Sequence, residues 1–192
     1  CFSLGEGRST EDVCITNCYL ESACSTLKLG TESGGDFKCV TLSNCVMKGL
    51  QGGEYARQGR YRPANAGIGI MTVDGAHIDG VSVSNVVMHD IRAPVFIRLG
   101  NRGRDMPTPV PGTLTNVNID NIVATNATLS SSITGIPGHP VTGISLSNIR
   151  LIYAGGSTYK PASESPCPKW KVLIRKHACS AGCQPAGCMS DT

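Results

Sequence analysis

Two acidic residues, Glu32 and Asp74, each closely follow a short apolar segment of this sequence. A pair of carboxyl groups can supply an acid that protonates a leaving group and a base that activates water. The sequence therefore offers Glu32 and Asp74 as candidates for general acid–base chemistry. Each has a simpler alternative: Asp74 precedes Gly75 in an Asp-Gly turn signal, and Glu32 can form a weak exposed ion pair with Lys28.

Basic residues stand near the same kind of segment. Lys28 lies between two leucines, so it points away from the buried side of an alternating strand. Arg98 and Arg102 lie at the end of another such segment and in the loop after it. Because Arg can hold a carboxylate in a bidentate geometry, these residues are candidate contacts for an acidic ligand, with ordinary solvated surface as the alternative. His139, in a Gly-His-Pro turn, is a further candidate, with a structural role as its alternative.

A repeated strand pattern must position these side chains. A short alternating segment that ends in Asn recurs at Val13–Asn17, Val40–Asn44, Val81–Asn85, Val117–Asn121 and Ile144–Asn148. Each copy has apolar residues at its first and third positions and small polar residues between them, which predicts a strand with one buried face. A second apolar strand follows four of these copies, at residues 26–29, 68–70, 94–97 and 131–134.

Two strands per loosely kept repeat predict an all-β parallel β-helix, or solenoid, of about five coils. Successive coils lie about 4.8 Å apart, so like positions stack and each coil buries the apolar face of its neighbour. Asn can adopt the left-handed conformation of a tight bend, and stacked Asn amides can bond to one another as a ladder. We expect the five strands that end at these asparagines to be parallel and adjacent in one sheet.

Composition agrees with this fold and limits the function classes. Charged residues make up 16% of the chain and Gly is abundant at 23 residues, which disfavours a helical bundle. A net charge of +3 is too small to argue for nucleic acid, and no apolar run is long enough to predict a membrane span. From residue 155 the alternation stops. We therefore divide the chain into β-helix coils over 1–154 and an irregular, Cys- and Pro-rich tail over 155–192.

Ten cysteines favour disulfides outside a reducing compartment over unpaired thiols, so we expect an extracellular or periplasmic location. The Cys-x2-Cys pairs of a zinc site are missing, and we expect no metal and no cofactor. Cys18 and Cys45 each follow a repeat Asn and should stack within disulfide reach. A plain column of thiols is the alternative for this pair.

Four phrases of the sequence resemble glycoside hydrolase family 28, the polygalacturonase family, particularly its bacterial-type branch. The likeness covers roughly residues 1–154, and the phrases are Asn17–Leu20, Leu27–Ser33 with Gly35–Phe37, Pro94–Arg102 and Ser132–Pro140. This resemblance implies a right-handed parallel β-helix that hydrolyses α-linked galacturonide chains of pectic polysaccharide with inversion. The implied partner is an acidic plant-type polysaccharide, bound by a monomer.

The sequence departs from the family in its catalytic motifs. The family takes its acid and base from an Asn-Thr-Asp and a Gly-Asp-Asp motif, and neither is present; the second would fall just before Cys1. The family's Gly-His-Gly and Arg-Ile-Lys positions fall near 24–26 and at 69–71 without their basic side chains, which argues against simple polygalacturonate. We expect at most trace hydrolase activity from these residues, and cleavage of a galacturonate-containing glycan by a chain that extends upstream.

Two other functions stay open at this point. A non-catalytic β-helix that binds carbohydrate, or that acts as an adhesin or structural rod, is favoured by the missing acid pair. A pectate lyase relative would need clustered aspartates for Ca²⁺, whereas the aspartates of this sequence are dispersed.

Overall fold

The computed structural model describes residues 8–32, 34–50, 64–104 and 106–153, and these residues form two β-sheets. The larger sheet has the order β1 (Thr10–Thr16), β4 (Phe37–Gly49), β6 (Ile78–His89), β8 (Leu114–Ala127), β10 (Thr142–Tyr153), and β2 (Tyr19–Ser22) also pairs with β4. The smaller sheet has the order β3 (Ser25–Leu29), β5 (Ala66–Thr72), β7 (Ala93–Leu99), β9 (Ser132–Thr134). The pairings between these strands are parallel, and the described residues contain no helix, so the all-β prediction is confirmed.

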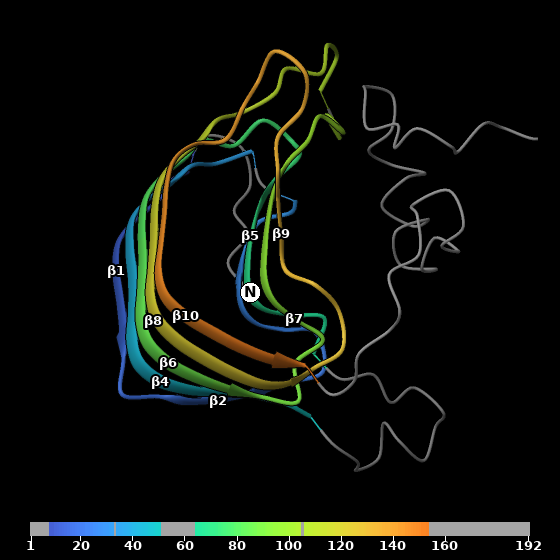
Figure 1. Cartoon of the computed structure of the whole chain (residues 1–192). Helices are drawn as coiled ribbons and strands as arrows, with labels where there is room; N and C mark the ends of the chain where they lie inside the picture. The colour runs from blue at the N-terminus through green and yellow to red at the C-terminus, as the bar shows by residue number, and fades with distance from the viewer. Residues whose placement is uncertain (1–7, 33, 51–63, 105, 154–192) are drawn as a thin grey trace, which may run out of the picture.

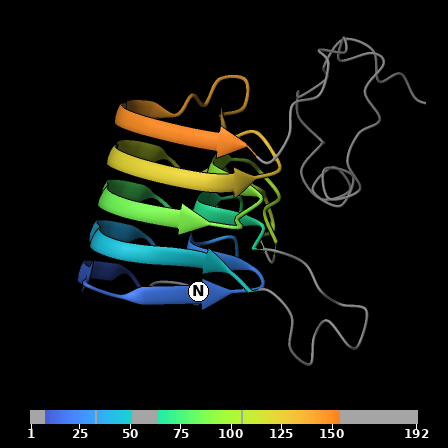
Figure 2. The ribbon, with the colours of Figure 1, turned by 60° about the horizontal axis from the view of Figure 1, so that its bottom comes forward.

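The chain alternates between the two sheets. Each strand of the smaller sheet lies in sequence between strands of the larger one, as β7 lies between β6 and β8 (Figure 1). Within each sheet the strands stack in chain order, from β1 and β2 at one end to β10 at the other (Figure 2). The predicted adjacency of the five repeated strands, which are β1, β4, β6, β8 and β10, is therefore confirmed, and the four predicted second strands are β3, β5, β7 and β9.

Residues in the left-handed conformation bend the strands of the larger sheet. Asn17, Asn44, Asn85, Asn121 and Asn148 have φ angles of 51–56° and occupy one position of the register. Strands β4, β6, β8 and β10 continue through their Asn, whereas β1 ends before it. The expectation that every strand ends at the Asn is therefore wrong. The Asn turns the strand without ending its pairing.

The side-chain amides of these residues form a ladder. Asn85 Nδ2 donates to Asn44 Oδ1 at 3.1 Å, and Asn121 Nδ2 donates to Asn85 Oδ1 at 2.8 Å. At the next strand the pattern changes, because Asn148 Nδ2 donates to Asp120 Oδ1 at 2.9 Å. The predicted ladder is confirmed over Asn44, Asn85 and Asn121.

A second stack of left-handed residues lies nearer the start of the same strands, and the sequence analysis did not anticipate it. Its members share one register position and have φ angles of 53–71°; they are Asp12, Cys39, Gly80, Asn116 and Gly143. Space is short here, since a Cβ on Gly143 would lie 2.7 Å from Asn116 Oδ1. This stack adds a second bend to the larger sheet.

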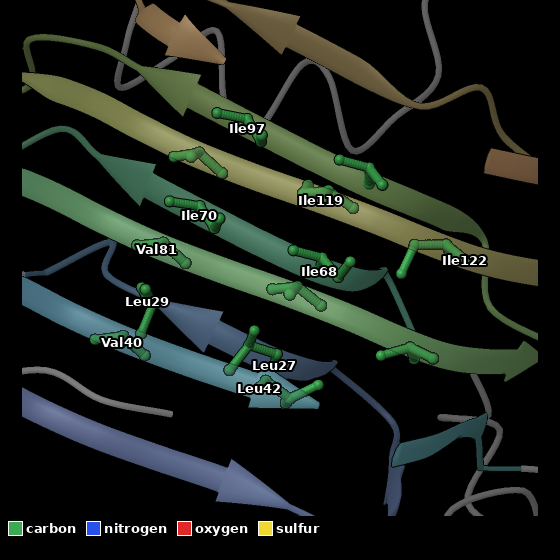
Figure 3. Packing of buried hydrophobic residues seen from close by; sticks show 14 of the residues in the cluster. Leu27, Leu29, Val40, Leu42, Ile68, Ile70, Val81, Ile97, Ile119 and Ile122 are labelled. Carbon is green, nitrogen blue, oxygen red and sulfur yellow. The ribbon is translucent and has the colours of Figure 1, made fainter. Parts of the chain in front are cut away.

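Apolar side chains from both sheets meet in one core (Figure 3). The smaller sheet contributes leucines and isoleucines that alternate along its strands. The larger sheet contributes the first and third residues of the repeated segment and apolar residues after its Asn, such as Ile122. Ten of these side chains are at most 2% exposed: Leu27, Leu29, Ile68, Ile70, Ile97, Val40, Leu42, Val81, Ile119 and Ile122. The predicted alternation is therefore confirmed in β4 and β8, whereas every residue of β5 is buried.

The cysteines of the described residues are free: Cys14, Cys18, Cys24, Cys39 and Cys45. Cys18 and Cys45 are neighbours in register, and their thiols donate to the carbonyl oxygens of Thr16 and Ser43 at 3.2 Å and 3.1 Å. The disulfide expectation is wrong for this pair, and the thiol column is confirmed. The remaining cysteines and the predicted tail over 155–192 lie outside the described residues.

Replacement of Asn85 tests the ladder. We predict that Asn85→Ala lowers the free energy of unfolding by about 2 kcal/mol, because Ala disfavours the left-handed backbone and cannot replace the two ladder hydrogen bonds. Asn85→Gly, which keeps the backbone freedom, should lose less. Urea denaturation measures both against the neighbouring control Ser84→Ala, and a loss in Asn85→Ala no larger than in this control would contradict the prediction.

Candidate functional site

The turns that follow β3, β5 and β7 lie at one edge of the smaller sheet, at the top of Figure 1, because parallel strands run in the same direction. Glu32 follows β3, Asp74 follows β5, and Arg102 and Arg104 follow β7. The backbone N–H of Arg102 donates to the carbonyl oxygen of Val73 at 2.6 Å and so joins two of these turns. We call Glu32, Asp74, Arg102 and Arg104 the turn cluster.

Asp74 and Arg102 form the buried part of the turn cluster. Arg102 Nε donates to Asp74 Oδ1 at 2.9 Å, and Nη2 donates to Oδ2, so the pair is bidentate. The backbone N–H of Arg104 adds a bond to Oδ1 at 3.1 Å. The side chains of Asp74 and Arg102 are only 6% and 16% exposed. A carboxylate at such a depth is tolerated because charged and backbone donors replace its water.

The pKa of Asp74 reflects this environment. Burial by itself raises the pKa of the carboxyl group, but the hydrogen bonds and charge of Arg102 and the backbone N–H of Arg104 lower it. The net result is a pKa below the ordinary value. A general acid at neutral pH needs a raised pKa. The structure thus brings the catalytic candidate Asp74 into an environment that favours its structural alternative.

Two carboxyl groups of the larger sheet are shifted in the same direction. Hydrogen bonds from the amide of Asn116 and the hydroxyl of Thr115 lower the pKa of Asp79. Hydrogen bonds from Ser147 and Asn148 lower the pKa of Asp120. Ser147 Oγ donates to Asp120 Oδ1 at 2.6 Å. Within the described ranges, each carboxyl group with a shifted pKa therefore has a lowered pKa, which favours its ionised form.

Glu32 and Arg104 form the exposed part of the turn cluster. Arg104 Nη1 donates to Glu32 Oε1, and Arg102 Nη1 lies 3.8 Å from the same oxygen. The side chains of Glu32 and Arg104 are 58% and 46% exposed. The exposed ion pair proposed for Glu32 thus exists with arginines of a later turn, where the sequence had suggested Lys28.

Arg104 is the cluster member that the sequence analysis missed. It lies two residues after Arg102 in the loop that follows the apolar segment at 94–97, where nothing local marks a partner. A usable signal was the alignment of repeats, because Glu32, Asp74 and Arg104 each lie a few residues beyond a second strand. Aligned turns after neighbouring parallel strands are expected to lie side by side.

Lys28 and Arg98 extend the positive charge along the outer face of the smaller sheet. Lys28 lies between two buried leucines and points away from the core, as predicted. It pairs in register with Gly69, which pairs with Phe96, two residues before Arg98. Arg98 Nε is buried and has no hydrogen-bond partner within the part of the chain that the structure describes. Lys28, Arg98 and the turn cluster together hold four cations and two carboxylates, a net charge of +2.

His139 lies in the exposed turn between β9 and β10. Its backbone N–H donates to the carbonyl oxygen of Ile136 at 2.9 Å, and the N–H of Ile136 donates back to the carbonyl oxygen of His139 at 3.2 Å. These bonds close a tight turn. The geometry favours the structural alternative for His139.

Two features are absent from the described residues. No group of three or more His, Cys, Asp or Glu side chains among them is placed to hold a metal ion. No helix among them is long and apolar enough to cross a membrane.

Replacement of the buried carboxylate tests the turn cluster. We predict that Asp74→Asn lowers the free energy of unfolding by about 3 kcal/mol, because Arg102 would keep its charge without a carboxylate partner in a mostly buried position. Glu32→Gln, at the exposed end of the same cluster, should cost only about 0.5 kcal/mol. Urea denaturation of both variants measures the difference, and equal losses would show that burial does not distinguish the two carboxylates.

Asp74 should also make stability depend on pH. Its folded pKa lies below the ordinary value of 3.8, so its contribution is fully present above that value and is lost as the pH falls through the folded pKa. Between about pH 6 and about pH 3, the wild type should lose more stability than Asp74→Asn. Denaturation midpoints across this pH series measure the effect; parallel curves for the two proteins would refute it.

Comparison with known proteins adds no further assignment for this chain. No protein-family model, no curated protein and no solved structure matches it. The function must therefore be argued from the residues, the geometry of the turn cluster and the neighbouring cations.

Proposed function

We propose that this chain is a polygalacturonase-type glycoside hydrolase in ancestry and that its described residues bind an acidic, galacturonate-containing glycan. The observation that carries the proposal is the net charge of +2 formed by Lys28, Arg98 and the turn cluster at one edge of a parallel sheet. Guanidinium groups bind carboxylates in matching geometry, and a pectic glycan carries carboxylates along its length. Such a substrate also favours an extracellular or periplasmic location.

For the fold we propose a right-handed parallel β-helix of about five coils. Three observations support it: the chain alternates between two parallel sheets, like strands stack in chain order, and left-handed residues share register positions. One core continues from strand to strand, as expected where each coil buries the face of the next.

Catalysis is the less supported half of the proposal. Inverting hydrolysis needs an acid and a base about 6.5–9.5 Å apart, and the acid needs a raised pKa. Asp74, Asp79 and Asp120 instead have lowered pKa values, and the sequence carries neither family motif for the acid and base. This observation favours a second candidate function, a non-catalytic carbohydrate-binding module. We accordingly expect at most trace hydrolysis from these 192 residues.

Binding to pectic polymers tests the proposal. We predict that the chain binds polygalacturonate or rhamnogalacturonan but not neutral galactan, and that Arg98→Gln weakens the binding by about fivefold, because one carboxylate contact is lost. Lys38→Gln is the matched control, since Lys38 is a half-exposed cation of the larger sheet that pairs with Glu11 at 3.4 Å.

Affinity electrophoresis measures the binding, and release of reducing sugar is followed on the same samples. Absence of binding to every acidic polymer would refute the proposal. Robust release of reducing sugar, abolished by Glu32→Gln or Asp74→Asn, would show that these carboxylates are catalytic and that the binding-module candidate is wrong.

A further inference from the structure

The turn cluster alternates in charge from its buried end to its exposed end, in the order Asp74, Arg102, Glu32, Arg104. Arg102 uses Nε and Nη2 for Asp74 and presents Nη1 to Glu32 Oε1 at 3.8 Å. Arg104 Nη1 donates to the same oxygen. Glu32 Oε1 therefore marks a position where one carboxylate oxygen meets two guanidinium groups.

The two carboxylates of the cluster are held very differently. Asp74 is bonded by two nitrogens of one guanidinium group and by a backbone N–H, and its side chain is 6% exposed. Its departure would require the loop after β7 to unpack. Glu32 is 58% exposed, and water competes for its ion pairs with Arg104 and Arg102. Another carboxylate can therefore replace Glu32 but not Asp74.

A carboxylate from solution suits this position better than a neutral group does. It restores a carboxylate to Arg104 and to Nη1 of Arg102 when Glu32 leaves, whereas a neutral sugar hydroxyl leaves Arg104 without its counter-charge in the turn cluster. A polyuronate carries one carboxylate on each sugar. When one of them occupies the Glu32 position, Lys28 and Arg98 are the cations that the outer face of the smaller sheet offers to its neighbours.

We propose that Glu32 is an exchangeable anion, whose place on Arg104 and Arg102 is taken by a carboxylate of the bound glycan. The inference rests on the proposed function and names the groups that distinguish acidic from neutral sugars. Glu32 lowers the affinity for the glycan, because a ligand must displace it. Glu32 also makes binding selective for acidic glycans, since only an anion can replace the negative charge that Glu32 removes from Arg104 when it leaves.

The test compares trigalacturonate binding by the wild type, Glu32→Gln and Glu11→Gln in titration calorimetry. Glu32→Gln should bind about threefold to tenfold more tightly at low salt, because the competing charge is gone, and the difference should shrink as salt rises. Glu11→Gln makes the same change of charge on the larger sheet, where Glu11 is 50% exposed and pairs with Lys38 at 3.4 Å, and should change the affinity less than about twofold. Adding Arg104→Gln to Glu32→Gln should remove the gain.

The outcomes separate this inference from the function on which it rests. A gain of equal size in both single variants would indicate a general charge effect and overturn the inference. So would weaker binding by Glu32→Gln with an unchanged unfolding midpoint, because Glu32 would then support the bound ligand. If wild-type binding depends on Arg98 but is indifferent to Glu32, the proposed function stands and the exchange is refuted. Absence of trigalacturonate binding in all variants would overturn both.

Discussion

In-register pairing between parallel strands is the constraint on which the core, the bends and the turn cluster depend. Val40 pairs with Val81, and Val81 pairs with Val117, so one apolar position becomes a continuous buried column. The same register carries the turns of successive strands to one edge. It thereby joins Glu32 and Arg104, which are 72 residues apart in the sequence. A shift of one residue would reverse the faces of a strand and lose these relations together.

The two bends of the larger sheet differ in how far the sequence predicts them. The Asn stack was predictable because one residue type recurs where the backbone is left-handed, and Asn tolerates that conformation. The second stack was not predictable, because its members include Asp12, Cys39 and Gly80, which are three different residue types. Cys39 has only a weak intrinsic preference for the left-handed conformation, so its pairing with the neighbouring strands must impose that conformation. Conformation follows local chemistry at the first bend and tertiary pairing at the second.

The candidate site divides along the same line. The outward direction of Lys28 follows from alternation with its neighbours, and the positions of Glu32 and Asp74 after strands follow from the repeat. The pairing of Asp74 with Arg102 depends on the path of the loop after β7, which brings together two residues 28 positions apart in the sequence. No local pattern encodes that path. The sequence could therefore name most of the charged residues of the site, but not which carboxylate would be buried and which exposed.

Burial decides what each carboxylate of this protein can do. A carboxyl group becomes an acid at neutral pH where the cost of burying its charge exceeds the help of its donors. At Asp74 the donors outweigh a substantial burial, and at Asp79 and Asp120 amide and hydroxyl donors act almost without opposition. These groups stay charged. Asp74 accordingly fixes the position of Arg102, whose Nη1 lies 3.8 Å from Glu32 Oε1. Asp74 therefore serves to position a guanidinium group, whereas the donors to Asp79 and Asp120 are uncharged. None of the three has the raised pKa that a general acid at neutral pH needs.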